Sequence, residues 1–361
     1  MFRWFVFAPV YLILALAVTP IPAVAEPRLI GLGIPDGATS SEVLDLSGDG
    51  CVAVARTVQW RDGLLEALTV GPFSTHGPAA DVVSYDGSIS AGSTGYWAFG
   101  RSGDGVHTRP AIELPVVSVT GISADGFVAV GSAGPEETVG LGRTVGWRWE
   151  EGMLELFDEP QSAWLGIAAV SGDGATVAGW EDDRVFVERD GVRTHITSGR
   201  PTAVSADAST VVGYSDASLT QAFHWANGKL TELGDLPTGD LGSRALDVTA
   251  DGSRVVGQGS EHGPVYPKVA FLWDAENGMR KLRSVLRDEF GLDVDRWILE
   301  SAVAISDDGR TIVGNGLYFA EGDSSPPRRE AWLAVLEDGP PCPESPTALE
   351  PDLVAPPRGD S

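Results

Sequence analysis

The sequence predicts an all-β fold, a seven-bladed β-propeller of four-stranded antiparallel blades closed by its N-terminal strand. Three observations support this prediction. A Ser/Thr-x-Asp-Gly motif recurs along the chain, short aliphatic runs follow its copies, and the last repeat lacks a final strand. From Asp49 to Asp308 the motif advances 259 residues in six intervals, a mean of about 43, which is the length of one blade.

The motif has the chemistry of a tight hairpin turn. An Asp-Gly pair tolerates the positive φ angles that such turns require, and the hydroxyl and carboxylate side chains can bond nearby backbone amides. An aliphatic residue precedes every copy, Ala208 replaces the glycine of one copy, and six copies have a second glycine five residues after the turn. The copies span residues 47–50, 84–87, 123–126, 171–174, 205–208, 249–252 and 306–309.

Each copy of the motif lies inside a unit that is predicted to form four strands. A short strand ends at the hydroxyl residue, a second follows the turn as in residues 210–213, and a fourth resembles residues 229–233. The third strand carries aromatic residues two positions apart, as in Phe223 and Trp225, so both rings point to one face. The recurring tryptophans Trp60, Trp149, Trp225 and Trp273 are interpreted as packing between blades, with sugar-stacking platforms as the alternative. The longest interval contains residues 284–291, where a serine N-cap and a glycine stop predict one helix.

The two ends of the repeat region complement each other. The last repeat has a third strand at residues 331–335, but Gly339-Pro340-Pro341 follows instead of a fourth strand. Residues 28–33 resemble a fourth strand, so we expect them to complete the last blade and remove an exposed sheet edge. Cys51 and Cys342 would then lie on neighbouring blades. We expect a disulfide between them in an oxidising compartment, with two free thiols as the alternative.

The N-terminus has the pattern of a signal peptide over residues 1–25. Arg3 precedes an apolar run, and the small residues of Ala23-Val24-Ala25 predict cleavage after Ala25. An uncleaved membrane anchor is the alternative, because the uncharged stretch is long enough to span a bilayer. The propeller is expected over residues 26–338, and the proline-rich, acidic residues 339–361 are expected to be disordered. These features predict a secreted, periplasmic or cell-surface protein with no membrane span after processing.

The chain is strongly acidic, with a formal charge of -26 and a pI near 4.4. Such a charge repels phosphate backbones, so nucleic acid is excluded as a partner. It fits a basic partner or a cation, although an acidic surface also serves solubility alone.

Sequence motifs of catalysis are absent. The chain has no Gly-x-Ser-x-Gly elbow, no phosphate-binding Gly-x-x-x-x-Gly-Lys and no His-Glu-x-x-His, and no catalytic, cofactor or metal residue is assigned. Calcium is considered because residues 45–50 and 247–252 begin with an extra aspartate, like the first half of an oxygen-ligand loop, whereas hairpin turns explain the same residues without metal. Trp164 and Trp180 lie outside the recurring aromatic positions of the third strands and are candidate ligand-facing residues.

The repeat units resemble those of the bacterial extracellular HAF-repeat proteins. The resemblance rests on Val204-Ser205, on residues 211–213 and on Ala222-Phe223-His224-Trp225, with a second copy at residues 255–257 and 270–273. Gln221 and Val269 stand where that family has histidine. The resemblance implies an extracellular location and a propeller-like repeat fold, and it implies no particular activity.

Two functions are compatible with these observations. The first is an exported, non-catalytic repeat protein, a monomer whose loops bind a protein or a glycan. The alternative is a secreted propeller hydrolase that acts on polysaccharide with acidic residues near the central channel. Two or three carboxylates with raised pKa values in one pocket would favour the hydrolase, and isolated acids would count against it.

Overall fold

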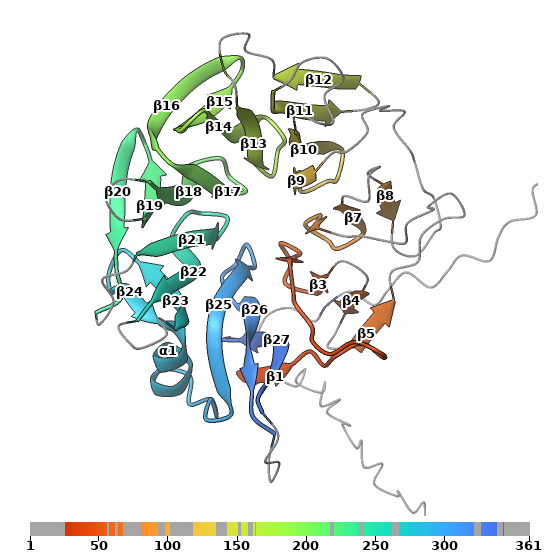
Figure 1. Cartoon of the computed structure of the whole chain (residues 1–361), viewed down its shortest axis with the longest axis vertical. Helices are drawn as coiled ribbons and strands as arrows, with labels where there is room; N and C mark the ends of the chain where they lie inside the picture. The colour runs from red at the N-terminus through yellow and green to blue at the C-terminus, as the bar shows by residue number, and fades with distance from the viewer. Residues whose placement is uncertain are drawn as a thin grey trace, which may run out of the picture.

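A computed structural model describes most of residues 26–337. The described residues are 26–55, 58–61, 64–67, 81–92, 98–101, 118–134, 143–150, 153–157, 162, 164–216, 220–237, 242–261, 267–320, 326–337 and 342. The predicted signal peptide lies outside them, as does the predicted disordered tail apart from Cys342. Nearly all regular structure in these ranges is β-strand, arranged as separate sheets around one axis (Figure 1).

The sheets are antiparallel, and each begins with a strand close to the axis. We number them in chain order of that innermost strand. Sheet 1 contains β2 (Asp45–Leu46), β3 (Val52–Val54), β4 (Val58–Arg61) and β5 (Leu64–Ala67). Sheet 2 contains β6 (Val82–Val83), β7 (Ile89–Gly92) and β8 (Ala98–Arg101). Sheet 3 contains β9 (Ser118–Ile122), β10 (Val128–Ala133), β11 (Val145–Glu150) and β12 (Met153–Phe157).

The remaining sheets are longer and more regular. Sheet 4 contains β13 (Leu165–Val170), β14 (Thr176–Glu181), β15 (Arg184–Arg189) and β16 (Val192–Ser198). Sheet 5 contains β17 (Arg200–Val204), β18 (Thr210–Ser215), β19 (Gln221–Ala226) and β20 (Lys229–Gly234). Sheet 6 contains β21 (Ser243–Val248), β22 (Arg254–Ser260), β23 (Lys268–Asp274) and β24 (Gly278–Lys281). Sheet 7 contains β25 (Trp297–Ile305), β26 (Thr311–Tyr318), β27 (Arg328–Val335) and β1 (Arg28–Gly31).

The protein is therefore an all-β propeller of four-stranded antiparallel blades, as predicted, but the predicted number of such blades is wrong. The structure shows six four-stranded blades rather than seven, because sheet 2 has three strands. Residues 102–117, which follow β8, lie outside the described residues. The N-terminal strand β1 is hydrogen-bonded to β27, with Arg28 opposite Val335 and Gly31 opposite Trp332.

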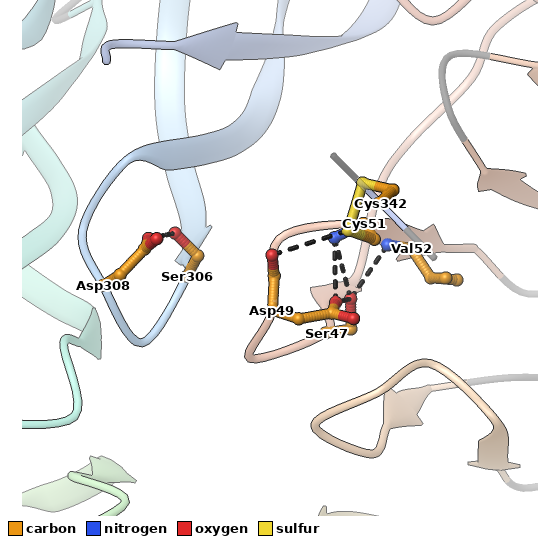
Figure 2. Close-up of a disulfide and its surroundings, with 7 residues drawn as sticks. All are labelled: Ser47, Asp49, Cys51, Val52, Ser306, Asp308 and Cys342. Atoms are coloured by element: carbon orange, nitrogen blue, oxygen red, sulfur yellow. Dashed lines mark hydrogen bonds between the residues drawn. A yellow bond between two sulfur atoms is a disulfide. The ribbon is translucent and has the colours of Figure 1, made fainter. Parts of the chain in front are cut away.

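The recurring motif forms the same turn in all of its copies. In turn 306–309, the Ser306 hydroxyl donates to Asp308 Oδ1 at 2.7 Å and accepts the Thr311 amide at 3.0 Å (Figure 2 shows the first of these bonds). The Gly309 amide donates to the Ser306 carbonyl at 2.8 Å, and the φ angle of Gly309 is 73°. These bonds satisfy a fully buried hydroxyl and fix the turn, which explains why the Ser, Asp and Gly positions recur together.

The turns are joined to one another by backbone hydrogen bonds. In each turn an amide at the second or third position donates to the carbonyl of the second residue of the next turn along the chain, and the last turn donates to the first. The bonds run from Asp49 to Tyr85, Tyr85 to Ala124, Ala124 to Gly172, Gly172 to Ala206, Asp207 to Ala250, Ala250 to Asp307 and Asp307 to Gly48, with lengths of 2.8 to 3.2 Å. We call this set the turn ring.

Apolar side chains fill the spaces between neighbouring sheets. The buried residues form separate clusters, and each cluster joins one sheet to the next. The cluster between sheets 7 and 1 contains Val313 and Ala331 from one side and Leu46 and Trp60 from the other. The interface between the last and first sheets is thus packed in the same way as the others.

In sheets 3 to 7, the glycine that follows the turn leaves room for an aromatic ring. A Cβ atom on Gly213 would lie 2.2 Å from the Arg200 carbonyl oxygen and 3.0 Å from the Phe223 ring. Gly213 lies opposite Phe223 across β18 and β19, and Phe223 is fully buried. The same pairing recurs at Gly131 and Trp147, Gly179 and Phe186, Gly257 and Phe271, and Gly314 and Trp332.

The tryptophans that the sequence assigned to packing do pack between sheets. Trp60 is buried at 1% exposure. Trp149, Trp225 and Trp273 are partly buried against the clusters that join their sheets to the neighbours. In those three sheets, the aromatic residue two positions before this tryptophan in the same strand is fully buried.

One helix, α1 (Leu282–Asp288), follows β24 in the described residues. The predicted start at Ser284 is wrong, because the helix begins at Leu282 and Lys281 is its N-cap without a side-chain bond. Burial of Leu282, Val285 and Leu286 between sheets 6 and 7 sets the start instead. Over the described part of the chain, no helix has the length and apolar character needed to cross a membrane.

Ala208 offers a test of the turn geometry, because it is the residue at the glycine position of its turn and has a φ of 61°. Ala208→Gly should raise the free energy of unfolding by up to about 1 kcal/mol, since glycine adopts this conformation without steric cost. The matched change Gly252→Ala should lower it by more than about 1 kcal/mol, because its Cβ would lie 2.1 Å from Thr210 Oγ1. Urea unfolding measures both variants, and a loss of stability in Ala208→Gly would contradict the turn geometry.

Candidate functional site

The innermost strands of all seven sheets line a central cavity of about 380 Å³. Most of its wall consists of aliphatic side chains and backbone. Four aspartates, Asp45, Asp81, Asp247 and Asp307, also line it, and no lysine, arginine or histidine is among its lining residues. The cavity is therefore acidic.

Asp45 and Asp247 occupy the same place in sheets 1 and 6, two residues before the hydroxyl of the turn. One oxygen of each carboxylate accepts the amide of the next residue at 2.8 Å. The other oxygen of Asp45 accepts the Val83 amide at 2.9 Å, and that of Asp247 accepts the Ile305 amide at 2.8 Å. Each carboxylate thus ties its own sheet to the following one.

These two aspartates are the residues that the sequence offered as possible calcium ligands. Their carboxylate oxygens bind backbone N–H groups, which supports the interpretation of residues 45–50 and 247–252 as turns. Within the described ranges, no group of three or more His, Cys, Asp or Glu side chains is arranged to hold a metal ion.

The position of these carboxylates changes their acidity. Burial raises the pKa of Asp45 to about 7, even though its two backbone hydrogen bonds favour the charged form. Burial also raises the pKa of Asp247 to about 8, and the negative charge of Asp45 adds to this effect. Both groups therefore take up a proton as the pH falls from mildly alkaline through neutral.

The raised pKa values predict a pH-dependent stability. Between about pH 4, the pKa of an unfolded aspartate, and pH 7 to 8, the folded state binds more protons than the unfolded state, so stability falls as pH rises. We expect a higher urea midpoint at pH 5 than at pH 8. The double variant Asp45→Asn/Asp247→Asn should lose most of this difference, because its two amide side chains do not titrate. The variant keeps the general charge repulsion of the chain nearly unchanged, so that repulsion does not account for the loss. An equal pH dependence in both proteins would contradict the assignment.

One mouth of the cavity is surrounded by the turn ring. The second residues of six turns, including Gly48, Tyr85 and Asp307, are among the lining residues. A Cβ atom on Gly48 would lie 2.4 Å from the Tyr85 ring and 3.0 Å from Asp307 Oδ2, so the ring and the carboxylate meet over this glycine. We call Tyr85, Asp49 and Asp307 the acidic mouth.

The acidic mouth concentrates negative charge. Burial, together with the charges of Asp308 and Asp49, raises the pKa of Asp307 to about 6. Burial and then the charges of Asp307, Asp49 and Asp308 raise the pKa of the Tyr85 hydroxyl as well. Tyr85 is 45% exposed, so its ring is accessible at the mouth.

The other turn aspartates extend this charge around the ring. The hydrogen bond from the Ser171 hydroxyl lowers the pKa of Asp173. At Asp86, Asp207 and Asp251 partial burial would raise the pKa, but hydrogen bonds from neighbouring hydroxyls and amides outweigh it and the pKa is lowered. These carboxylates stay ionised at neutral pH.

Trp164 and Trp180, the candidate ligand-facing aromatics, do not lie at the acidic mouth. Both are at the ends of β13 and β14 that are remote from turn 171–174. Trp164 is 54% exposed, and Trp180 is partly buried with the Arg200 guanidinium 5.3 Å from its ring centre. Asp81 and Asp307 were not predicted as cavity residues. Their only sequence signal is their position close to or within a copy of the turn motif.

Cys51 and Cys342 form a disulfide, the pairing that the sequence led us to expect (Figure 2). Their Cα atoms are 5.6 Å apart, and the bond packs against Val52 and Val83 between sheets 1 and 2. The Cys51 amide also donates to Asp49 Oδ1 at 3.0 Å, so the bridge begins at turn 47–50. It fastens a residue that follows β27 in the chain to the first sheet.

Comparisons with known proteins identify the fold and no family. No family model matches the chain. No curated protein matches it either, so the resemblance to HAF-repeat proteins stays a prediction.

Solved structures do match. An oligogalacturonate lyase from Vibrio parahaemolyticus is 12% identical with a TM-score of 0.53, and the match covers 86% of this chain and 97% of that one. An oligogalacturonate lyase in complex with manganese is 13% identical with a TM-score of 0.51, covering 87% and 95%. TolB from Acinetobacter baumannii is 11% identical with a TM-score of 0.43 over 66% of this chain, and this chain spans 61% of that protein, less than two thirds of its length. At such identities the two lyase structures show a shared propeller fold alone.

Proposed function

We propose that the chain is an exported, non-catalytic binding module, built as a ring of sheets that the N-terminal strand closes. Its acidic mouth holds a cationic group, such as a lysine or arginine side chain of a partner protein. The observation that carries this proposal is the meeting of Tyr85 and Asp307 over Gly48 at the entrance of an acidic cavity.

Export is supported by two independent features. Residues 1–25 have the charge and small-residue pattern of a signal peptide. The disulfide between Cys51 and Cys342 suits an oxidising compartment outside the cytoplasm, where such bonds persist.

Ring closure is supported by three contacts between the first and last parts of the chain. Strand β1 pairs with β27, the Asp307 amide donates to the Gly48 carbonyl, and Val313 shares a cluster with Trp60. A closed ring leaves no long sheet edge open to other chains, and it holds the residues of the acidic mouth in fixed positions.

The chemistry of the mouth favours a cation. Asp49 and Asp307 supply negative charge, and the Tyr85 ring can receive a cation over its face. Among the described residues, no basic side chain lines the cavity to compete. The net charge of -26 attracts a basic partner over longer range.

A short peptide containing lysine and arginine tests this proposal. We expect Asp307→Asn to weaken its binding about tenfold, the cost of one charge-assisted hydrogen bond, as measured by calorimetry at pH 7.5. Binding to the unchanged protein should also weaken as pH falls through about 6, where Asp307 takes up a proton. Asp190→Asn removes the same charge from an exposed turn of sheet 4 and should leave binding intact. Equal binding by both variants, or no binding by the unchanged protein, would contradict the proposal.

A polysaccharide hydrolase is the second candidate, because three carboxylates with raised pKa values, Asp45, Asp247 and Asp307, line one cavity. Binding is favoured over hydrolysis because both oxygens of Asp45 and of Asp247 already accept backbone amides. Release of reducing ends from polysaccharide by the unchanged protein, lost in Asp307→Asn, would favour the hydrolase instead.

A further inference from the structure

A second, smaller cavity lies at the opposite end of the sheets from the acidic mouth. It has a volume of about 270 Å³ and is lined by ends of β21, β22 and β23 together with residues Thr220 and Gly242. Turn 249–252, which borders the acidic mouth, is at the other end of β21 and β22. Nothing in the proposed function uses this cavity.

Four polar side chains form the sheet side of this cavity. Arg244 lies opposite Gln258 across β21 and β22, and Lys268 lies opposite Ser260 across β22 and β23. Directly opposite residues of an antiparallel pair share a face, and so do residues two apart in one strand, so all four are on one face of sheet 6. The register of three strands thus brings two positive charges, one amide and one hydroxyl together.

The two cations of this cavity have no counter-charge within the described part of the chain. The Arg244 guanidinium lies 4.6 Å from the Tyr214 ring centre, a contact that orients it without neutralising it. Glu261, the carboxylate next to Ser260, is paired with Lys281. In a chain of net charge -26, two cations that meet no described carboxylate at one polar cavity are a feature that an anion would complete.

We propose that this cavity binds a small oxyanion that also bears hydroxyl groups, namely the carboxylate of an acidic sugar. Arg244 and Lys268 bind the carboxylate, and the arginine can do so with two parallel hydrogen bonds. Gln258 and Ser260 bind the sugar hydroxyls. The cavity is slightly smaller than the roughly 300–1,000 Å³ pockets that enclose drug-sized ligands, so it suits a single sugar unit.

Calorimetric titration of the mature protein with D-glucuronate and D-glucose tests the proposal, because these sugars differ at the carboxylate. We expect glucuronate to bind with a Kd near 1 mM or below, and glucose to bind at least tenfold more weakly. Inorganic phosphate distinguishes an acidic sugar from a bare oxyanion and should bind more weakly than glucuronate. Binding of both sugars alike, binding of neither, or phosphate binding as tight as that of glucuronate would overturn the proposal.

Two variants connect the binding to the residues. Lys268→Gln should weaken glucuronate binding about tenfold, and Lys229→Gln, the same change at an exposed lysine of sheet 5, should leave it unchanged. Lys268 is exposed, so its replacement leaves the fold intact; Arg244→Ala should weaken binding further, with unfolding by urea as the check on its stability. Equal affinities for the lysine variants would overturn the assignment. The basic-peptide titration is unaffected by either outcome, so this site and the acidic mouth are tested separately.

Discussion

The hydrogen bonds of the turn ring are the constraint on which the rest of the structure depends. Each turn fixes its own shape through a buried hydroxyl and an aspartate, and an amide near its tip then binds the carbonyl of the next turn. Because these bonds use backbone atoms, they tolerate glycine, alanine, tyrosine or aspartate at the second position. That freedom allows Tyr85 and Asp307 to enter the ring and form the acidic mouth without weakening it.

Much of the fold could be predicted because its signals are local and repeated. The turns recur in every sheet, and the glycine that follows them lies opposite an aromatic residue of the third strand in sheets 3 to 7. Each of these features reflects a steric requirement, so even turn 205–208 was recognised without its glycine. The helix start was missed because burial of Leu282 between two sheets, a tertiary effect, overrides the serine cap. The blade count was missed at sheet 2, which has three strands in the structure.

The candidate sites were harder to predict, because they arise where different sheets meet. Asp45 and Asp247 resembled metal ligands in sequence, and only the neighbouring sheets show that Val83 and Ile305 supply the amides they bind. Trp164 and Trp180 were predicted as ligand-facing because they lie outside the recurring aromatic positions. Arg244 and Lys268 have no distinguishing sequence pattern, and strand register brings them to one cavity. Local patterns therefore predicted the scaffold, and spatial convergence defined its chemistry.

The amide of Asp307 provides the most direct test of this account, because its bond to the Gly48 carbonyl joins the last turn to the first. Hydrogen exchange of the purified protein measures whether that bond forms in solution. The account predicts that the Asp307 amide is protected as strongly as the Ala124 amide, which makes the equivalent bond to Gly172 within the chain. Rapid exchange at Asp307 with continued protection at Ala124 would show an open ring and contradict it.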